Sequence, residues 1–344
     1  MPNTIYTPIL RWKRGERTGL SRLSTAGHAD VRPLFVLGVD QFKDRAATQA
    51  RPAIPAPNAF IADVLQCWGN TEFYVDASAL PMRGAQHPIV AIAQAARALG
   101  ASLIPAATSG APVPYLAAVQ QVEQTDQRGA ALRVDLQEFA TAAAWVPTWQ
   151  VPLPRTDLIA DFGGNVGTVA ALGVALDQTF ANLHQGNVWR RVSVAGSSMP
   201  DNFQGFPAGT HLIPRVEYQL WQRLRAVPLP YALHYGDFAN LSLASPPPGI
   251  AWGYPINAKY TRDNDFLICR GVRTEGQNAL DMDVQLISHA RTIRGYPNRN
   301  PLAFCWGDQV IDAIATNQQG PQGLEQWVSF TVNRHIELVR HLLP

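Results

Sequence analysis

Acidic residues end four short apolar runs of this sequence. Each run has four or five residues, mostly of β-favouring types, and precedes a segment that can turn and start a helix; the aspartates are Asp76, Asp135, Asp161 and Asp237. The carboxyl ends of the strands of a parallel (β/α)8 barrel converge on one face, where that fold places its active sites. We therefore expect these carboxylates to face a common mouth, where clustered acids bind a divalent cation or act as general acid and base.

Two reactions use carboxylates in such a cluster. The first is metal-assisted hydrolysis, for which Asp135 and Asp161 are the expected ligands of Mg²⁺ or Mn²⁺, although the sequence itself identifies no cofactor. The second is glycoside hydrolysis by a pair of carboxylates. His234 lies three residues before Asp237 and is the expected general base. The structural alternative is that each aspartate caps the next helix or stabilises a turn, and that His234 only packs in its strand.

Basic residues counterbalance these acids at two places in the sequence. Arg11 and Lys13 follow the first apolar run, with Glu16 just beyond, and Arg215 and Glu217 begin a helical pattern after a long loop. Together with the aspartates they predict a mixed-charge mouth suited to a phosphate, a carboxylate or a nucleotide. The structural alternative for the first group is a weak surface pair between Lys13 and Glu16.

A glycine–serine turn adds a further expected phosphate contact. Gly196, Ser197 and Ser198 follow the seventh apolar run, and (β/α)8 barrels often bind phosphate at the loops after strands seven and eight. Free backbone N–H groups and the serine hydroxyls would be the donors. The alternative is a tight turn that needs a positive φ at the glycine. Residues 196–214 are rich in Gly, Pro and polar residues, a composition typical of a lid or binding loop.

The elements that must position these residues form a repeating pattern. Short apolar runs alternate with helical patterns, and the predicted strands are residues 6–12, 31–38, 73–76, 102–108, 131–136, 157–162, 190–195 and 231–235. This alternation indicates βαβ units and a parallel sheet, and the nearly continuous apolar character indicates burial on both faces. Eight such units predict a (β/α)8 barrel. A doubly wound sheet is the alternative, but residues 11–15 lack the glycine fingerprint usual after its first strand.

The pattern changes after residue 245. Residues 245–249 read Ser-Pro-Pro-Pro-Gly, which breaks regular structure. The pattern then predicts a hairpin with strands at 254–260 and 266–269, followed by helices near 281–291, 308–316 and 323–343. We therefore expect a barrel over residues 1–245 and a C-terminal subdomain over residues 246–344 that packs on it.

Composition limits the classes of protein to consider. Of the 344 residues, 47% are hydrophobic and 16% charged, so the chain can bury a large core and is not disordered. A net formal charge of +2 argues against nucleic-acid binding by bulk attraction. Three scattered cysteines form no zinc pattern, and no apolar run reaches the ~20 residues that span a bilayer. Since the N-terminal stretch also lacks the apolar core of a signal peptide, we expect a cytoplasmic protein without a membrane partner.

Several short motifs resemble those of the beta family, which is named after a phage beta protein and occurs in bacteria and their phages. The first is Tyr6-x-Pro8-Ile9-Leu10-x-x-Lys13-x-Gly15-Glu16; the others are Val134-Asp135-Leu136, Arg215-x-Glu217-x-x-Leu220-Trp221, Tyr235-Gly236-Asp237, Cys305-x-Gly307-Asp308, and Trp327 followed by Asn333-x-His335. The resemblance covers nearly the whole chain. It implies no particular activity, so the function has to be argued from the residues.

Two functions fit these observations. The first is a barrel enzyme that acts on an anionic, phosphorylated or nucleotide-like ligand with the help of a divalent metal, with Lys13 and Arg215 holding the anion. The second is a non-catalytic scaffold in the conflict between phage and host, which binds a protein or a nucleic acid. Convergence of the four aspartates and Lys13 on one accessible pocket would favour the enzyme.

Overall fold

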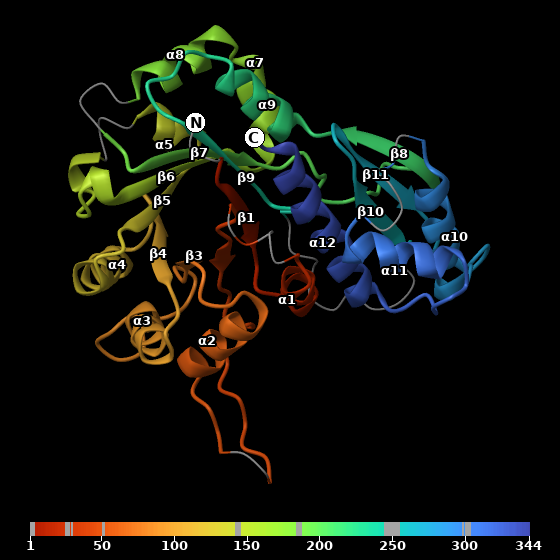
Figure 1. The fold of residues 1–344 in the computed structure, drawn as a ribbon, viewed down its shortest axis with the longest axis horizontal. Helices are drawn as coiled ribbons and strands as arrows, with labels where there is room; N and C mark the ends of the chain where they lie inside the picture. The colour runs from red at the N-terminus through yellow and green to blue at the C-terminus, as the bar shows by residue number, and fades with distance from the viewer. Residues whose placement is uncertain are drawn as a thin grey trace.

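Eight parallel strands close into a barrel in the computed structural model of this chain (Figure 1). The structure describes residues 4–24, 28, 30–49, 52–141, 146–183, 188–243, 255–297, 299 and 304–344. The barrel strands, in order around the ring, are β1 (Tyr6–Leu10), β2 (Leu34–Val36), β3 (Phe73–Asp76), β4 (Leu103–Thr108), β5 (Ala130–Val134), β6 (Thr156–Asp161), β7 (Arg191–Gly196) and β9 (Leu233–Asp237). The predicted (β/α)8 barrel is confirmed.

Helices surround the barrel, as expected of βαβ units (Figure 1). They are α1 (Arg14–Ser21), α2 (Ala56–Cys67), α3 (Pro88–Leu99), α4 (Val113–Asp126), α5 (Leu136–Ala140), α7 (Val166–Ala171), α8 (Val174–Asn182) and α9 (Val216–Arg225), with 3-10 turns at Val146–Thr148, Leu153–Arg155 and Gly163–Asn165. Residues 166–182 form two helices and not one continuous helix, because the chain turns at Gly173, which has a φ of +53°. The sequence pattern did not predict α1.

Apolar side chains fill the space on both sides of the barrel wall. Outward residues such as Tyr6, Leu10 and Tyr235 pack beneath the helices. The inward residues that fill the interior are Ile9, Leu34, Tyr74, Ile104, Ala106, Ala131, Ile159 and Ala195. Successive side chains of a strand point to opposite faces, so the position of a polar residue along its strand decides whether it lies inside the barrel or beneath a helix.

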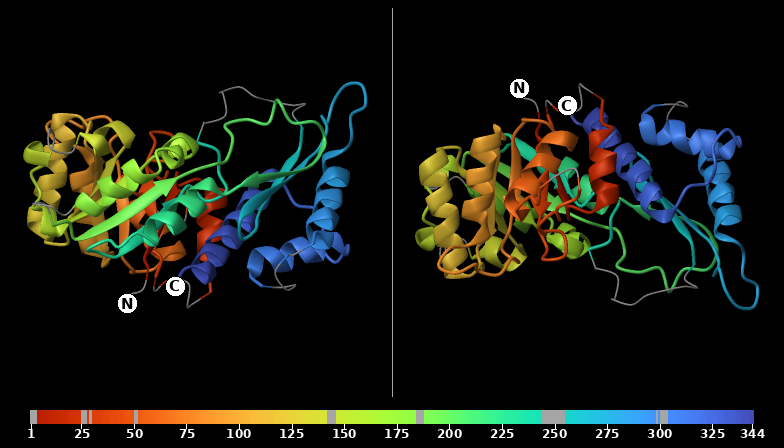
Figure 2. Two further views of the ribbon diagram at one scale, coloured as in Figure 1. Left: turned by 90° about the horizontal axis from the view of Figure 1, so that it is seen from above. Right: turned by 90° about the horizontal axis from the view of Figure 1, so that it is seen from below.

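A three-stranded antiparallel sheet lies beside the barrel (Figures 1 and 2). The predicted hairpin forms two of its strands, β10 (Asn257–Thr261) and β11 (Asp265–Arg270). The third is β8 (Gly209–Pro214), which pairs with β11. The prediction of an irregular lid over residues 196–214 is therefore wrong for their last six residues. β8 lies at an edge of the sheet, where polar residues and Pro214 are tolerated, and this concealed the strand in the sequence.

The last helix of the chain connects this sheet with the barrel. The helices that follow the hairpin are α10 (Met282–Gly295), α11 (Trp306–Ala315) and α12 (Leu324–Leu342). Val332, Ile336 and Val339 of α12 join the apolar core of the barrel, whereas Trp327 and Phe330 pack in a second core with α10 and α11. None of the described helices combines the length and the apolar character that a bilayer span requires. Residues beyond 245 thus contribute to the barrel core, and a domain boundary at 245 stays a prediction.

Candidate functional site

Two of the four predicted aspartates meet at the carboxyl end of the barrel. Arg133 of β5 lies between Asp76 of β3 and Asp161 of β6. Its Nη1 donates to Oδ2 of Asp76 at 2.8 Å, and its Nη2 donates to Oδ2 of Asp161 at 2.7 Å. The exposed fractions of these side chains are 14% for Arg133, 10% for Asp161 and 2% for Asp76. We call this group the Asp–Arg–Asp cluster; Asp161 and Arg133 are its most accessible members.

Further donors besides Arg133 hold the carboxylates of the Asp–Arg–Asp cluster: a backbone N–H and a hydroxyl for Asp76, and a backbone N–H for Asp161. Oδ1 of Asp76 accepts the N–H of Ser78 at 3.0 Å and its hydroxyl at 2.6 Å. Oδ1 of Asp161 accepts the N–H of Gly163 at 3.1 Å, and Oδ2 also accepts Nε of Arg133 at 3.3 Å. Each carboxylate thus accepts three hydrogen bonds of the roughly four that it can accept. Among the described residues, about one acceptor position on each carboxylate is unused, and Asp161 is the more exposed of the two.

Asp135 follows β5 but serves as the N-cap of α5. Its Oδ1 accepts the N–H of Glu138 at 2.8 Å, and Oε2 of Glu138 accepts the N–H of Asp135 at 2.9 Å, which forms a capping box. The structure therefore does not bring Asp135 and Asp161 together as the predicted metal pair. In the part of the chain that the structure describes, no group of three or more His, Cys, Asp or Glu side chains could hold a metal ion.

Arg11, Lys13 and Glu16 lie where β1 leads into α1. Glu16 is buried, and its Oε2 accepts the N–H of Arg11 at 2.6 Å. Burial raises the pKa of Glu16, although the contact with Arg11 reduces this effect. The guanidinium of Arg11 donates to the carbonyl of Ser242, which follows β9, and Lys13 is the partly buried N-cap of α1. Glu16 is thus a positioning residue that holds the backbone at the end of β1.

Two further residues at this end of the barrel carried no signal in the sequence. Lys259 of β10 lies close enough to Arg11 to be affected by its charge, and its Nζ is 5.5 Å from the centre of the Phe203 ring. Burial lowers the pKa of Lys259 to about 8, with a smaller contribution from Arg11. Asn240 is 1% exposed, and its Nδ2 donates to the carbonyl of Lys259 at 3.4 Å. A lysine in a hairpin and an asparagine in a loop are ordinary, so only the tertiary structure reveals this grouping.

Asp237 points towards α12 and away from the barrel interior. Its Oδ1 accepts the hydroxyl of Tyr6 at 2.7 Å, and its Oδ2 accepts Nε2 of His335 at 2.8 Å. Nδ1 of His335 accepts the hydroxyl of Thr261 at 2.9 Å. These four residues form the Asp237–His335 cluster, and all of them are buried. Burial raises the pKa of Asp237, but His335 and Arg215 outweigh it, so the pKa is lowered overall. The cluster joins β1, β9, β10 and α12 and has no access for a ligand.

Arg215, Glu217 and Ser198 lie beside the Asp237–His335 cluster and are equally withdrawn from solvent. Nη1 of Arg215 donates to the carbonyl of Asp263 at 3.1 Å, and Nη2 lies 3.8 Å from Oδ2 of Asp237. Nε of Arg215 lies 3.5 Å from Oε1 of Glu217, whose Oε2 accepts the hydroxyl of Ser198. Burial raises the pKa of Glu217 despite these contacts. The predicted role of Arg215 as an anion clamp would need an access that a fully buried side chain lacks.

The Gly-Ser-Ser turn after β7 uses its donors within the protein. The N–H of Ser197 donates to the carbonyl of Gly163 at 2.8 Å, and Oγ of Ser197 accepts the N–H of Met199 at 3.2 Å. A Cβ at Gly196 would lie 2.1 Å from Cγ1 of Val166, so close packing requires glycine there. The Ser197 N–H that was expected to bind phosphate is therefore already engaged.

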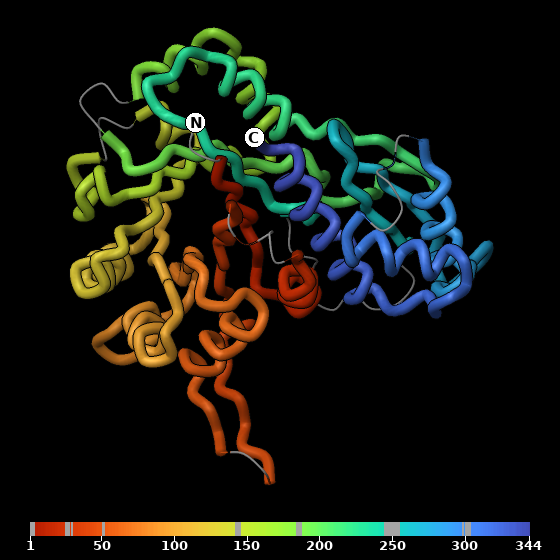
Figure 3. Tube along the Cα trace, viewed as in Figure 1, coloured from red at the N-terminus to blue at the C-terminus, as the bar shows by residue number. Residues whose placement is uncertain are grey.

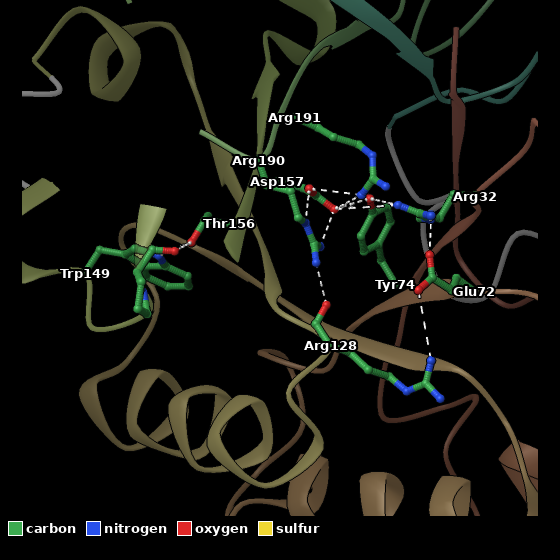
Figure 4. A network of polar contacts seen from close by, with 10 residues as sticks. Arg32, Glu72, Tyr74, Arg128, Trp149, Thr156, Asp157, Arg190 and Arg191 are labelled. Atoms are coloured by element: carbon green, nitrogen blue, oxygen red, sulfur yellow. Dashed lines mark hydrogen bonds and ion pairs between the residues drawn. The ribbon is translucent and has the colours of Figure 1, made fainter. Parts of the chain in front are cut away.

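His234 lies towards the amino end of the barrel, far along β9 from the strand's carboxyl end. Its Nδ1 accepts the N–H of Ile5 at 3.0 Å, and burial lowers its pKa to about 4. The same end holds Asp157, whose Oδ2 accepts the hydroxyl of Tyr74 at 2.6 Å and whose Oδ1 accepts Nε of Arg190 at 2.6 Å (Figure 4). Polar groups at this end of a (β/α)8 barrel contribute to stability. The structure does not bring His234 to the mouth, where a general base was expected.

Comparison with known proteins identifies the family of this chain. The family model described as Beta protein matches residues 6–341. The chain belongs to the Beta protein family. The resemblance seen in the sequence motifs is confirmed, and the match spans the barrel, the three-stranded sheet and α10 to α12. No curated protein and no solved structure matches the chain.

In this member of the Beta protein family, two groups of charged residues lie at the carboxyl end of the barrel. The Asp–Arg–Asp cluster comes from β3, β5 and β6, and the second group consists of Arg11 after β1 and Lys259 from β10. β5 lies four strands from β1 in either direction around the ring, so the two groups face each other across the mouth. Charged groups on opposite sides of the barrel mouth would suit a ligand whose two ends differ in charge.

Proposed function

We propose that the carboxyl end of the barrel binds a phosphorylated or nucleotide-like ligand, and that the Asp–Arg–Asp cluster forms one side of the binding site. The observation that supports this most is the position of Arg133, which holds Asp76 and Asp161 together at the face where (β/α)8 barrels bind their substrates. Arg11 lies across the mouth from this group. Hydroxyl groups at one end of the ligand and a phosphate at the other would match the two sides.

The Asp–Arg–Asp cluster would bind hydroxyl groups of a sugar or a ribose. The carboxylates of Asp76 and Asp161 are held in one orientation by Arg133, Ser78 and Gly163. Each keeps about one position for accepting a further hydrogen bond. Hydrogen bonds between a hydroxyl and an ionised carboxylate are short and about twice as strong as neutral ones. Because the acceptors are already fixed, the ligand would order few side chains on binding.

A divalent metal between the two carboxylates has no part in this proposal. The guanidinium of Arg133 occupies the position that a bridging cation would take between Asp76 and Asp161. A second cation beside it would be repelled, most strongly in a partly buried site. Asp135, the other expected metal ligand, is engaged in capping α5. We therefore expect binding to be independent of Mg²⁺ and Mn²⁺.

The proposal can be tested by thermal unfolding of the full chain with ribose 5-phosphate, ADP and ribose. A ligand that binds only the native state stabilises it, by about 2.7 kcal/mol at a hundredfold excess over Kd. We expect ribose 5-phosphate or ADP to raise the melting temperature, with and without EDTA. Asp161→Asn removes a hydroxyl acceptor and should abolish the increase. Asp135→Asn is the matched control, because asparagine also caps helices and should leave the increase intact.

Two results would contradict the proposal. One is the absence of stabilisation by every phosphorylated probe at millimolar concentration. The other is stabilisation that Asp161→Asn leaves unchanged, which would place the ligand elsewhere on the molecule. If a phosphorylated probe stabilised the protein only in the presence of Mn²⁺, a metal would take part in binding. The expectation of metal-independent binding, which is drawn from the position of Arg133, would then be wrong.

The alternative, a scaffold that binds a protein partner in phage–host conflict, has one observation in its favour. The connection between β2 and α2 leaves the barrel as an extended arm (Figure 3). Its described residues from Lys43 to Gln49 are exposed, and a bridge between Arg45 and Ile54 pairs its two sides. Exposed loops of this kind often bind partners. Pull-down experiments on infected and uninfected cells, with the full chain and with a variant in which the arm is shortened, would test this alternative. Capture of the same proteins by both chains would contradict it.

A further inference from the structure

We infer that the amino end of the barrel binds a tetrahedral oxyanion of the sulfate or phosphate class, between Arg32, Arg191 and His234. Arg32 precedes β2, Arg191 begins β7, and His234 is the second residue of β9. These positions lie at the opposite end of the barrel from the Asp–Arg–Asp cluster, so the inference does not depend on the proposed function.

Strand alternation directs Arg32 and Arg191 into the amino-end opening of the barrel. Leu34 of β2 and Ala195 of β7 fill the interior, and the two arginines lie an even number of residues before them, at positions that point the same way. Both guanidinium groups reach one atom of β6 (Figure 4): Nη1 of Arg191 lies 3.3 Å and Nη1 of Arg32 lies 3.8 Å from Oδ2 of Asp157. A shared carboxylate oxygen therefore holds the two cations close together.

The carboxylates at this end do not balance the arginines. Arg190 already donates through Nε and Nη2 to the two oxygens of Asp157, at 2.6 Å each. Glu72 is likewise shared, by Arg32 and by Arg128, whose Nη1 is 4.0 Å away. In the part of the chain that the structure describes, four guanidinium groups thus share two carboxylates. Like charges in a partly buried site destabilise one another unless an opposite charge intervenes, so the uncompensated positive charge favours a bound dianion.

Arg191 has donors left for such an anion. Among the described residues, its contacts with Asp157 all come from Nη1, which leaves Nε and Nη2 able to donate elsewhere. The Arg191 side chain is 30% exposed, against 2% for Asp157, so an anion can reach it from solvent. A guanidinium presents its N–H groups as a planar fork that matches the oxygens of a phosphate or sulfate group.

His234 provides a second, independent indication of a ligand. It precedes the outward-pointing Tyr235, so its ring faces the interior, and it pairs in register with Ser193, two residues from Arg191. Burial and the charge of Arg191 lower its pKa to about 4, so the ring is neutral at pH 7. Because Nδ1 accepts the N–H of Ile5, the ring proton is on Nε2. That N–H has no partner among the described residues although His234 is only 6% exposed, and an oxygen of the anion would accept it.

Equilibrium dialysis of the full chain with radiolabelled sulfate tests this inference. We expect saturable binding that unlabelled phosphate displaces and that chloride at the same ionic strength does not. Arg191→Gln should raise the Kd for sulfate at least about tenfold, because charge-assisted hydrogen bonds are lost. Arg97→Gln is the matched control: Arg97 pairs with Asp126 on the outside of the barrel and is 41% exposed, so its replacement should not change the Kd.

The ring of His234 reports the position of the anion in the wild-type chain. In NMR spectra at pH 7, with the resonance assigned through His234→Asn, we expect sulfate to shift the His234 signal and to leave the signal of the exposed His341 unchanged. The melting temperature of Arg191→Gln without sulfate shows whether that variant is folded. We expect it to be close to that of the wild type, because Asp157 keeps both hydrogen bonds from Arg190.

Any of three results would overturn the inference: no binding of sulfate up to millimolar concentration, binding that Arg191→Gln leaves unchanged, or a His234 signal that sulfate does not shift. None of them bears on the mouth of the barrel. Asp161→Asn should bind sulfate as the wild type does. Saturating sulfate would occupy the amino end, so ribose 5-phosphate and ADP added in its presence report on the mouth alone.

Discussion

Arg133 lies at the carboxyl end of the barrel with its guanidinium between two carboxylates that are themselves almost withdrawn from solvent. Burying three charges together is favourable only when each is well paired, and removing the central one leaves two negative groups without compensation. The arginine therefore has a structural role in addition to any role in binding. This distinguishes it from the arginines on the surface of the chain.

Replacing Arg133 by methionine should destabilise the protein by about 3–5 kcal/mol, the usual consequence of removing one partner from a buried ion pair. Urea unfolding followed by circular dichroism measures this change. Arg97→Met is the matched control: Arg97 pairs with Asp126 at 2.5 Å but is 41% exposed, so its loss should cost no more than about 1 kcal/mol. Equal destabilisation by both substitutions would show that the Asp–Arg–Asp cluster is not strongly coupled.

The sequence predicted which aspartates end strands but not which of them meet. Asp76 and Asp161 occupy inward positions of their strands and contact Arg133, whereas Asp237 occupies an outward position and contacts Tyr6 and His335. Asp135 lies beyond the end of β5, where capping is possible. All four aspartates share the same local sequence pattern. Whether one of them meets Arg133 depends on which face of the strand it lies on and on the residue at which the strand ends. Neither is visible in a run of four or five apolar residues.

At the scale of elements, α1 and α12 approach each other through glycine. A Cβ at Gly15 would lie 2.8 Å from the carbonyl of Glu325, and one at Gly19 would lie 2.7 Å from the carbonyl of Ser329. Nδ2 of Asn333 also donates to the carbonyl of Gly19 at 3.1 Å. The first helix of the barrel and the last helix of the chain are therefore packed backbone against backbone.

We expect Gly19→Ala to destabilise the protein by about 1–3 kcal/mol, because the added methyl group would push α12 away from α1. Differential scanning calorimetry measures the change. Gly167→Ala in α7 is the control, since no atom lies within 4 Å of its added Cβ and alanine is the better helix former by about 0.5–1 kcal/mol. A Gly19→Ala protein as stable as wild type would mean that the two helices are free to separate.

Element positions were predictable where the hydrophobic pattern was strong. The strand at residues 73–76 and the hairpin strands at β10 and β11 follow from β-rich apolar runs. β8 and α1 were missed because their partners come from distant parts of the chain. β8 has polar and exposed positions and pairs with β11, and α1 is rich in polar residues but is stabilised by α12. Tertiary contacts override local propensity at both places.

In the whole molecule, the Asp237–His335 cluster connects the barrel with the appended elements. Burial lowers the pKa of His335 more than Asp237 raises it, and the ring contacts Asp237 through Nε2 and the hydroxyl of Thr261 through Nδ1. Burial likewise lowers the pKa of His234, to about 4, and those of His87 and His289. Protonation of these rings in the native state is unfavourable, which makes the fold sensitive to acid.

The free energy of unfolding should therefore fall as the pH falls below about 6.5. Below this pH the unfolded chain binds protons at histidines that stay neutral in the folded chain, so protonation favours unfolding. His234 alone, with a folded pKa of about 4, should contribute a loss of about 3 kcal/mol between pH 6.5 and pH 4. Guanidinium unfolding across this range measures the slope. His234→Asn should flatten it, whereas substitution of the exposed His341 by asparagine should not; a slope unaffected by His234→Asn would contradict the assignment.

The barrel as a whole could be predicted because eight units of strand and helix leave few alternatives. The location of the appended sheet could not, since nothing local in β10 specifies that its Lys259 packs over the ring of Phe203, between β7 and β8. The candidate site is for that reason only partly readable from the sequence. Asp76, Asp161 and Arg11 were expected at the mouth, whereas Arg133, Asn240 and Lys259 emerged only from the packing of distant segments.

The central claim is that the mouth of this barrel binds a phosphorylated ligand and that the Asp–Arg–Asp cluster forms one side of the binding site. Equilibrium dialysis of the full chain with radiolabelled ribose 5-phosphate measures this binding directly. We predict saturable binding that does not require metal, is displaced by unlabelled ribose 5-phosphate much more readily than by ribose, and is lost in the Asp161→Asn variant. If the labelled ligand reached the same concentration on both sides of the dialysis membrane at every ligand concentration up to the millimolar range, the claim would be contradicted.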